Sequence, residues 1–125
     1  MSSLAATDRR NMEKLLRMSR GYVLDFSDRT FGEFVMDAVG LDIHSDKYTT
    51  GGTSKANRLR ALWRLEPDNV VGKLLLALID HEQDELLPNG REHADHVALT
   101  KRCRQIANRL LAGGSRSAQG ARRNS

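Results

Sequence analysis

The chain has 125 residues, of which 39 % are hydrophobic and 29 % charged, and its formal net charge is +4 at pH 7. This length fits one domain, and this composition excludes a disordered polypeptide. The longest apolar run, residues 74–79, is too short to cross a bilayer, so no membrane partner is expected. No apolar stretch of signal-peptide length begins the chain, and its single cysteine excludes an internal disulfide. We therefore expect a cytoplasmic protein.

The basic residues are unevenly distributed along the chain. Between residues 101 and 125 there are seven Lys or Arg and no acid, so this segment carries +7. The other thirteen basic and sixteen acidic residues leave the rest of the chain at −3. Such an asymmetry fits a nucleic acid, an acidic protein partner or a solubilising tail, and an ordinary solvated helix face explains it equally well.

Two helices are predicted in the N-terminal half. The first spans about residues 7–19, capped by Thr7 or Asp8, with an apolar stripe of Met12, Leu15 and Leu16. Residues 22–26 alternate apolar side chains, which predicts a short extended connection. The second helix begins after Ser27, ends at Gly40 and carries an apolar face of Phe31, Phe34, Val35 and Ala38. In the polar loop that follows, residues 42–53, we expect Tyr48 to be exposed and to anchor a protein partner.

Three more helices follow this loop. Ser54 caps the third, which Pro67 ends and whose buried arc is Ala56, Leu59, Leu62 and Trp63. Asp68 caps the fourth, whose core positions are Val71, Leu74, Leu75, Leu78 and Ile79. The fifth spans about residues 91–112, with an apolar stripe of Leu99, Cys103, Ile106 and Leu110.

These patterns predict an all-α fold, a compact bundle of about five helices over residues 1–112. The aromatic faces of the second and third helices should pack on the apolar fourth helix. Residues 113–125 are rich in Gly, Ser and Arg and have almost no apolar side chain to bury, which predicts a disordered basic tail.

The segment S-K-A-N-R-L-R, residues 54–60, places a capping residue and three basic side chains at a helix start. Helix N-termini present free N–H groups and the positive end of the helix dipole, both of which suit phosphate. The candidates for binding an anion or a nucleic acid here are Lys55, Arg58, Arg60 and Arg64. Arg60 and Arg64 should share the outward face. Arg58 flanks the apolar arc and also fits a structural ion pair with Asp25 or Asp28.

The fifth helix places polar and basic side chains opposite its apolar stripe. Its basic members, Lys101, Arg102 and Arg109, are the remaining candidates for binding nucleic acid. Because no aromatic side chain lies among them, stacking on single-stranded bases is not favoured.

No catalytic or cofactor-binding signature is complete, since P-loop, G-x-G-x-x-G, G-x-S-x-G and H-E-x-x-H patterns are absent. His93 and His96 are three residues apart, but no zinc-ligand spacing accompanies them, so no metal site is expected. Arg91 and His96 fit the loose R-x4-H pattern of HEPN-type ribonucleases, which arises by chance in a chain this basic. We expect no catalytic residue and no cofactor, with a ribonuclease as the weakest alternative.

Two segments carry a resemblance to a known family. Residues 18–31 read M-S-R-G-Y-V-L-D-F-S-D-R-T-F, and residues 54–60 read S-K-A-N-R-L-R. Between them stand Phe34, Gly40, Asp42–Ile43 and Lys47–Tyr48. Taken together, these residues resemble the N-terminal domain of AbiJ-type abortive-infection proteins over about residues 12–81.

The resemblance implies a helical module of bacterial phage-defence proteins, which precedes varied C-terminal domains, HEPN-type ribonucleases among them. This chain departs from that layout, because one helix and a basic tail are too little for a four-helix nuclease domain. We therefore expect a non-enzymatic recognition or adaptor module of an abortive-infection system, with a protein effector or sensor as partner. The alternative is a nucleic-acid-binding protein that uses the basic residues of the third and fifth helices.

Overall fold

The computed structural model describes residues 2–86 and 94–112, and all regular structure within these ranges is helical. The elements are α1 (Ala6–Leu15), the 3-10 turn η1 (Ser19–Gly21), α2 (Asp28–Val39), the 3-10 turn η2 (Asp46–Tyr48), α3 (Lys55–Leu65), α4 (Asp68–Leu86) and α5 (Ala94–Leu111). The predicted all-α class with five helices is confirmed for the described part of the chain. The predicted tail and Arg91, the expected start of the fifth helix, lie outside the described residues.

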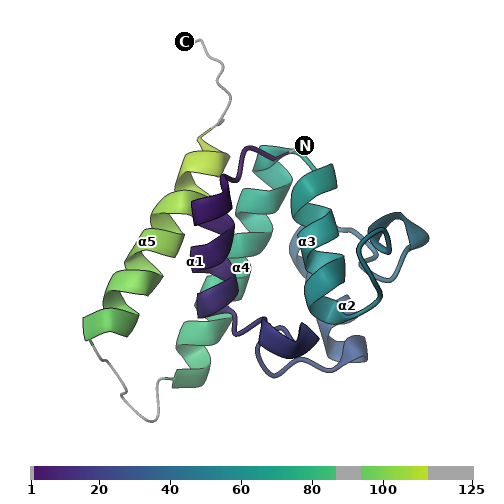
Figure 1. Ribbon diagram of the computed structural model, residues 1–125, viewed down its shortest axis with the longest axis horizontal. Coiled ribbons are helices and arrows are strands. Elements are labelled where there is room, and N and C mark those ends of the chain that lie inside the picture. Colours follow the sequence, from purple (N-terminus) through teal and green to yellow (C-terminus); the bar gives the residue numbers. More distant parts are fainter. Residues whose placement is uncertain (1, 87–93, 113–125) are drawn as a thin grey trace.

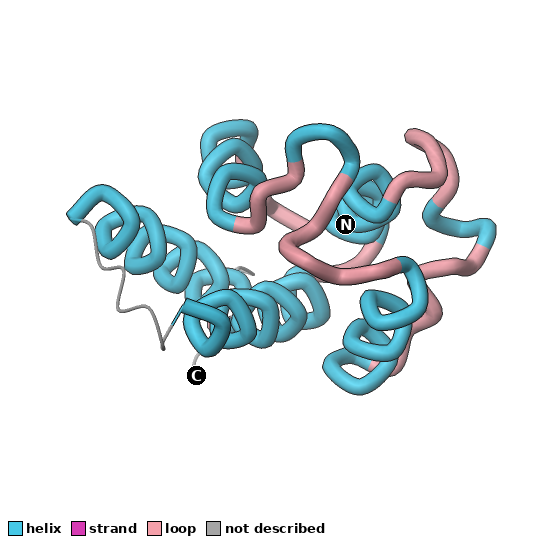
Figure 2. The backbone as a smooth tube through the Cα atoms, turned by 90° about the horizontal axis from the view of Figure 1, so that it is seen from below, coloured by secondary structure: helices cyan, strands magenta, loops and turns pink. Residues whose placement is uncertain are grey.

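The helices fall into two groups (Figure 1). Helices α4 and α5 lie against each other over much of their length, and α1 packs on α5. Helices α2 and α3 stand on the other side of α4, and α2 contacts it directly. Figure 2 shows that the irregular loops gather on the side of α2 and α3. Among the described residues, helices α1 and α5 therefore form the side with few loops.

Helix α2 begins and ends where its sequence predicts. Ser27 caps it, because its Oγ accepts a hydrogen bond from the Thr30 N–H at 3.1 Å, while Thr30 Oγ1 accepts from the Ser27 N–H at 2.9 Å. This reciprocal pair satisfies two backbone donors that the helix leaves unpaired. Gly40 ends the helix in the left-handed region, with φ 72°, and its N–H donates to the Met36 carbonyl.

The junction between α3 and α4 is set by a proline. Ser54 caps α3 by accepting from the Asn57 N–H at 3.1 Å, as predicted. Pro67 keeps Glu66 in an extended conformation, so α3 stops at Leu65. The carboxylate of Asp68, which we expected to cap α4, accepts instead from the N–H and the hydroxyl of Ser3, at 2.5 and 2.7 Å. This contact holds the N-terminal segment against the start of α4.

The N-terminal connection differs from the sequence prediction. Helix α1 is capped at Ala5, not at Thr7 or Asp8, and it ends at Leu15 rather than near Ser19. It ends early because Arg17 adopts a left-handed conformation, φ 55°, which closes the last turn. Residues 22–26 form no strand.

The turn in residues 22–26 has its own backbone hydrogen bonds. Leu24 also has a positive φ, 48°, and its N–H donates back to the Leu16 carbonyl at 2.8 Å. Phe26 N–H donates to the Val23 carbonyl at 3.2 Å. These bonds fold the segment back on the end of α1, so it cannot run extended.

The hydrophobic core surrounds α4. All five positions predicted for its core are fully buried: Val71, Leu74, Leu75, Leu78 and Ile79. The ring of Phe26 stacks on His81 of α4 with centroids 4.7 Å apart, and it also contacts Phe34 of α2 at 5.0 Å. The predicted packing of the aromatic face of α2 on α4 is thus confirmed, and Trp63 of α3 belongs to the same buried cluster. No helix in the described ranges is long and apolar enough to cross a membrane.

Gly72 allows α4 and α5 to pack closely. A Cβ at this position would lie 2.9 Å from the Ala107 carbonyl oxygen and 3.0 Å from Leu111 Cγ. Alanine is the better helix former by about 1 kcal/mol, but overpacking costs about 1–3 kcal/mol. We expect Gly72→Ala to lower the free energy of unfolding, measured in urea.

The control for this prediction is Gly51→Ala, because a Cβ there would meet no atom within 4 Å. It should leave the free energy of unfolding within about 0.5 kcal/mol of the parent protein. If Gly72→Ala is as stable as this control, α5 can shift without loss of packing and the close approach is not required.

Candidate nucleic-acid interface

The four candidate cations of α3 all make intramolecular contacts. Arg58 Nε donates to the Thr53 carbonyl at 3.1 Å, and its Nη1 donates to the Ile43 carbonyl at 3.2 Å. These bonds tie the loop of residues 42–53 to the start of α3. The ion pair that we expected between Arg58 and Asp25 or Asp28 is therefore wrong, since the guanidinium satisfies backbone carbonyls instead.

Asp28 nevertheless joins α2 to α3 through a different residue. Its Oδ1 lies 3.6 Å from Lys55 Nζ, and the same ammonium lies 5.3 Å from the ring centroid of Tyr22. Asp28 is largely exposed, so this ion pair contributes little to stability. The pair instead positions Lys55, which it holds near Tyr22 and away from the outward face of α3.

Arg60 and Arg64 are also engaged. Arg60 forms a two-pronged ion pair with Glu13 of α1, at 3.0 and 3.1 Å, and its third donor reaches Asn57 Oδ1 at 2.8 Å. Such a fork matches carboxylate geometry and fixes α1 relative to α3. Arg64 donates to Thr50 Oγ1 at 2.7 Å. The structure therefore does not gather the α3 cations into one open anion site.

Tyr48 is not the exposed anchor that the sequence suggested. Only 2 % of its surface is exposed, and its hydroxyl donates to Glu66 Oε2 at 2.6 Å. Lys47 Nζ lies 2.6 Å from the same oxygen. Burial, followed by this hydrogen bond, raises the pKa of Tyr48 well above its usual range. The 3-10 turn η2 directs the ring inward, so the prediction of an exposed interface residue is wrong.

The exposed face of α5 agrees with the sequence analysis. The side chains of Lys101, Arg102 and Arg109 are exposed, and the apolar stripe opposite them is largely buried. Arg109 pairs with Asp8 of α1 at 2.7 Å. Arg102 lies seven residues before Arg109 and therefore on the same side of α5, the side next to α1. Lys101 and Arg102 make no ion pair or hydrogen bond within the described residues.

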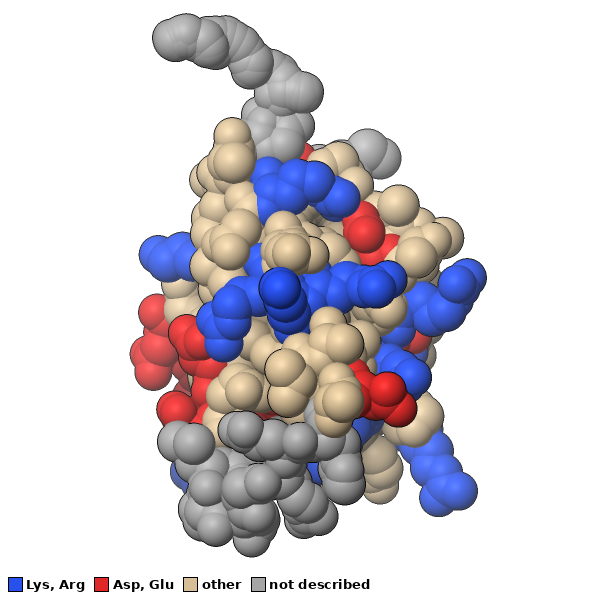
Figure 3. Space-filling model, turned by 90° about the vertical axis from the view of Figure 1, so that its left-hand side faces the viewer, with Lys and Arg blue, Asp and Glu red and all other residues tan. Residues whose placement is uncertain are grey.

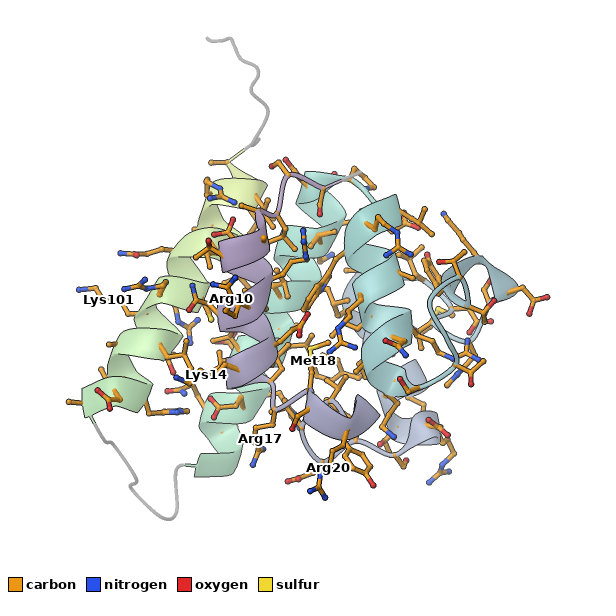
Figure 4. The ribbon with its side chains drawn as sticks, viewed as in Figure 1. Arg10, Lys14, Arg17, Met18, Arg20 and Lys101 are labelled. Carbon is orange, nitrogen blue, oxygen red and sulfur yellow. The ribbon has the colours of Figure 1, made fainter. Side chains whose placement is uncertain are left out.

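Helix α1 adds cations to this face. Its two acids are occupied, because Asp8 pairs with Arg109 and Glu13 pairs with Arg60. Figure 4 shows four basic residues following one another down α1 and the turn after it, with Lys101 across from them on α5: Arg10, Lys14, Arg17 and Arg20. We define the α1–α5 basic surface as Arg10, Lys14, Arg17, Arg20, Lys101 and Arg102. All six side chains are exposed.

The charge on this side of the molecule is largely uncompensated. Figure 3 shows Lys and Arg gathered across the middle of this face, with Asp and Glu mainly towards its edges. Arg10, Lys14 and Arg20 have no polar partner in the part of the chain that the structure describes. Clustered cations without intramolecular partners keep their donors available for an anionic ligand.

Two members of this surface stand in backbone positions that favour glycine. Arg17 has φ 55° and Arg20 has φ 68°. A left-handed conformation costs about 1–2 kcal/mol for a residue other than glycine. Arginine at these two positions therefore makes the fold less stable than glycine would. Such a cost in stability is expected where a side chain is needed for binding.

The sequence analysis missed the α1 half of this surface. A signal was present, since Arg10, Lys14 and Arg17 have helical spacing on the face opposite Met12 and Leu15. Arg20 had no such signal, because its position depends on the early end of α1 and on η1.

The described residues that were considered for metal or acid–base chemistry do not form a site. His96 Nε2 lies 3.1 Å from Glu82 Oε2, although the two are not aligned as a hydrogen bond. Burial raises the pKa of the Cys103 thiol to about 12, so it is neutral at physiological pH. The described residues contain no group of three His, Cys, Asp or Glu able to hold a metal. His93 and Arg91 lie outside the described residues.

No family model, curated protein or solved structure matches this chain. The resemblance to AbiJ-type N-terminal domains therefore stays a prediction. The two segments that carry it do meet in space. A Cβ at Gly21 would lie 3.0 Å from Ser54 Cβ, and Asp28 pairs with Lys55.

The contact between Tyr48, Lys47 and Glu66 makes stability depend on pH. The hydrogen bonds from Lys47 and then Tyr48 lower the pKa of Glu66 below its ordinary value of 4.5. A lowered folded-state pKa stabilises the protein above about pH 4.5, and this contribution is lost as the pH falls through the folded pKa. Glu66→Gln should therefore unfold more easily than the parent protein at pH 7, and the difference should shrink towards pH 3. Urea midpoints at several pH values measure it.

Asp46→Asn serves as the control, because this acid lies in the same turn but is exposed. Its urea midpoint should follow that of the parent protein at every pH. A Glu66→Gln difference that stays constant from pH 7 to pH 3 would contradict the assignment.

Proposed function

We propose that the protein is a non-enzymatic recognition module that binds the phosphate backbone of nucleic acid through the α1–α5 basic surface. The observation that carries this proposal is the set of exposed cations on α1, the turn after it and α5, beside two α1 acids that already pair with Arg60 and Arg109. Phosphate contacts of this kind supply affinity without reading sequence. The two arginines at positive φ support the same conclusion, since glycine would be more stable there.

Binding of this type should be insensitive to base sequence. The surface consists of Lys and Arg side chains on two helices, with no aromatic residue among its six members. Bases are read by side chains that enter a groove or stack on unpaired bases. A surface made only of cations contacts the phosphate backbone and not the bases. We therefore expect similar affinity for nucleic acids of different sequence and equal length.

The proposed setting is a bacterial anti-phage defence system, in which this module would work with a separate protein effector. This part of the proposal rests on the resemblance of residues 18–31 and 54–60 to AbiJ-type proteins. The contact between these segments supports treating them as one structural unit. A strain that expresses the protein should survive phage challenge better than one that expresses a reversed basic surface, provided both proteins accumulate equally.

A protein-binding adaptor is the second candidate function, and one observation favours it. Tyr22 is 56 % exposed, and Lys55 Nζ lies over its ring. An exposed tyrosine is a common interface anchor. Tyr22 could therefore serve the adaptor function in the way that the buried Tyr48 cannot. Under this alternative the α1–α5 basic surface would be an ordinary solvated face.

Charge reversal on α5 separates the two functions. Lys101→Glu/Arg102→Glu should weaken binding to random-sequence DNA and RNA at least about tenfold, because two phosphate contacts become repulsive. The slope of log affinity against log salt should lose about 2 units of magnitude. Fluorescence anisotropy at two salt concentrations, with duplex and single-stranded probes, measures both quantities.

Arg29→Glu/Lys73→Glu is the matched control, because both residues are exposed and lie outside the α1–α5 basic surface. It changes the net charge equally and should weaken binding far less. No binding by the parent protein at either salt concentration would exclude the nucleic-acid proposal and favour the adaptor. Equal losses in the two double variants would show that net charge alone, and not this surface, attracts the probe.

Arg20 allows function and stability to be separated. Arg20→Gly should raise the thermal midpoint, because glycine adopts φ 68° without strain, yet it should lower nucleic-acid affinity because one cation is lost. Arg20→Lys should keep both the charge and the strain, and so retain affinity without any gain in stability. Calorimetry and anisotropy on the same samples test this pair. A glycine variant that is less stable than the lysine variant would mean that the arginine side chain is structural.

A further inference from the structure

A cavity of about 290 Å³ lies between the N-terminal segment, α1 and α3. It is lined by Ser2, Leu4, Arg9, Arg60, Trp63 and Arg64. The N-terminal segment is fixed beside it, because the Ser2 hydroxyl donates to the Trp63 carbonyl and Ser3 donates to Asp68. None of the six residues belongs to the α1–α5 basic surface.

Trp63, one of the lining residues, has an unused hydrogen-bond donor. Its side chain is 1 % exposed, and its Nε1–H is buried without an acceptor among the described residues. Leaving such a donor unpaired costs about 1–3 kcal/mol, and the large majority of buried polar groups in proteins are paired. A ligand that supplies an acceptor would remove this cost.

The charges around the cavity are not balanced. Glu13 neutralises Arg60, but within the described residues Arg9 donates only to the Leu4 carbonyl, at 3.1 Å, and Arg64 only to Thr50 Oγ1, at 2.7 Å. No carboxylate is found among the described residues that line the cavity. Arg9 and Arg64 therefore line the cavity without a carboxylate among its described lining residues, and Trp63, which also lines it, has a buried N–H that lacks an acceptor there.

We infer that this cavity binds a small phosphate monoester. Two uncompensated guanidinium groups match the two charges of the phosphate, and planar guanidinium groups can hold its oxygens in pairs. The Trp63 N–H would donate to an acceptor on the ligand, and Leu4 would cover its organic part. The volume is at the lower end of small-molecule sites, so it suits a phosphate with a small substituent and not a nucleic-acid strand.

The sequence provides a direct probe of this site, because Trp63 is its single tryptophan. Titration of the full chain with glycerol phosphate at constant ionic strength should produce a saturable change in tryptophan fluorescence. Inorganic phosphate should give the same change more weakly, since it lacks the organic part. Glycerol, which is neutral, should give none. A fluorescence change that follows ionic strength and does not saturate would overturn the inference.

Substitution of the two unbalanced arginines tests their role. Arg9→Gln/Arg64→Gln should weaken glycerol phosphate binding at least about tenfold, whereas Arg29→Gln, on α2, should leave it unchanged. If the double variant does not fold, Arg64→Gln alone replaces it, because Arg64 is exposed. Equal dissociation constants for the parent and either variant would overturn the inference.

Trp63→Phe tests the indole N–H while retaining an aromatic side chain. Glycerol phosphate should raise the thermal midpoint of the parent protein, and this rise should be clearly smaller in Trp63→Phe, because one charge-assisted hydrogen bond is missing. An equal rise in both proteins would exclude Trp63 from the site. These measurements contain no nucleic acid and alter no residue of the α1–α5 basic surface, so their failure would leave the proposed function untouched.

Discussion

The burial of α4 is the constraint on which the rest of the structure depends. Its five core side chains are completely removed from solvent, and a fully buried aliphatic side chain contributes about 1.5–3 kcal/mol. These side chains are buried because other elements of the chain pack around α4. Helix α5 approaches over Gly72, and the aromatic cluster of Phe26 and Phe34 reaches it at His81. Helix α1 then packs on α5, so the polar faces of these two helices turn outward together.

Ion pairs between helices decide which charges remain available. Glu13 holds Arg60, Asp8 holds Arg109, and Asp80 of α4 holds Arg104. Each of these three acids is balanced by the cation with which it pairs. Exposed pairs of this kind add little stability, and each pair has no net charge, so the additional cations of α1 and α5 leave this side positive. The basic surface therefore results from helix packing, although the body of the chain outside residues 101–125 has a net charge of −3.

The sequence predicted the helices well and the site only in part. Caps, glycines and prolines are local signals, so Ser27, Gly40 and Ser54 marked real boundaries. The early end of α1 was not predictable, because it depends on a left-handed Arg17 stabilised by hydrogen bonds to the preceding turn. The burial of Tyr48 and the contacts of the α3 cations could not be predicted, because the partners lie far away in sequence: Glu66 for Tyr48, Glu13 for Arg60 and Ile43 for Arg58. A charge pattern shows which residues could bind an anion, whereas tertiary contacts show which are already occupied.

Helix α1 is where the two proposed binding regions come closest in sequence. Successive residues on a helix are about 100° apart, so the neighbours Arg9 and Arg10 point in different directions. Arg9 lines the cavity beside Trp63, and Arg10 lies on the basic surface. A short helix of ten residues can therefore present cations to two separate places while its third side, with Met12 and Leu15, is buried in the core. This division of one helix into three faces separates the two proposed anion-binding regions, so that such a small domain need not place their charges together.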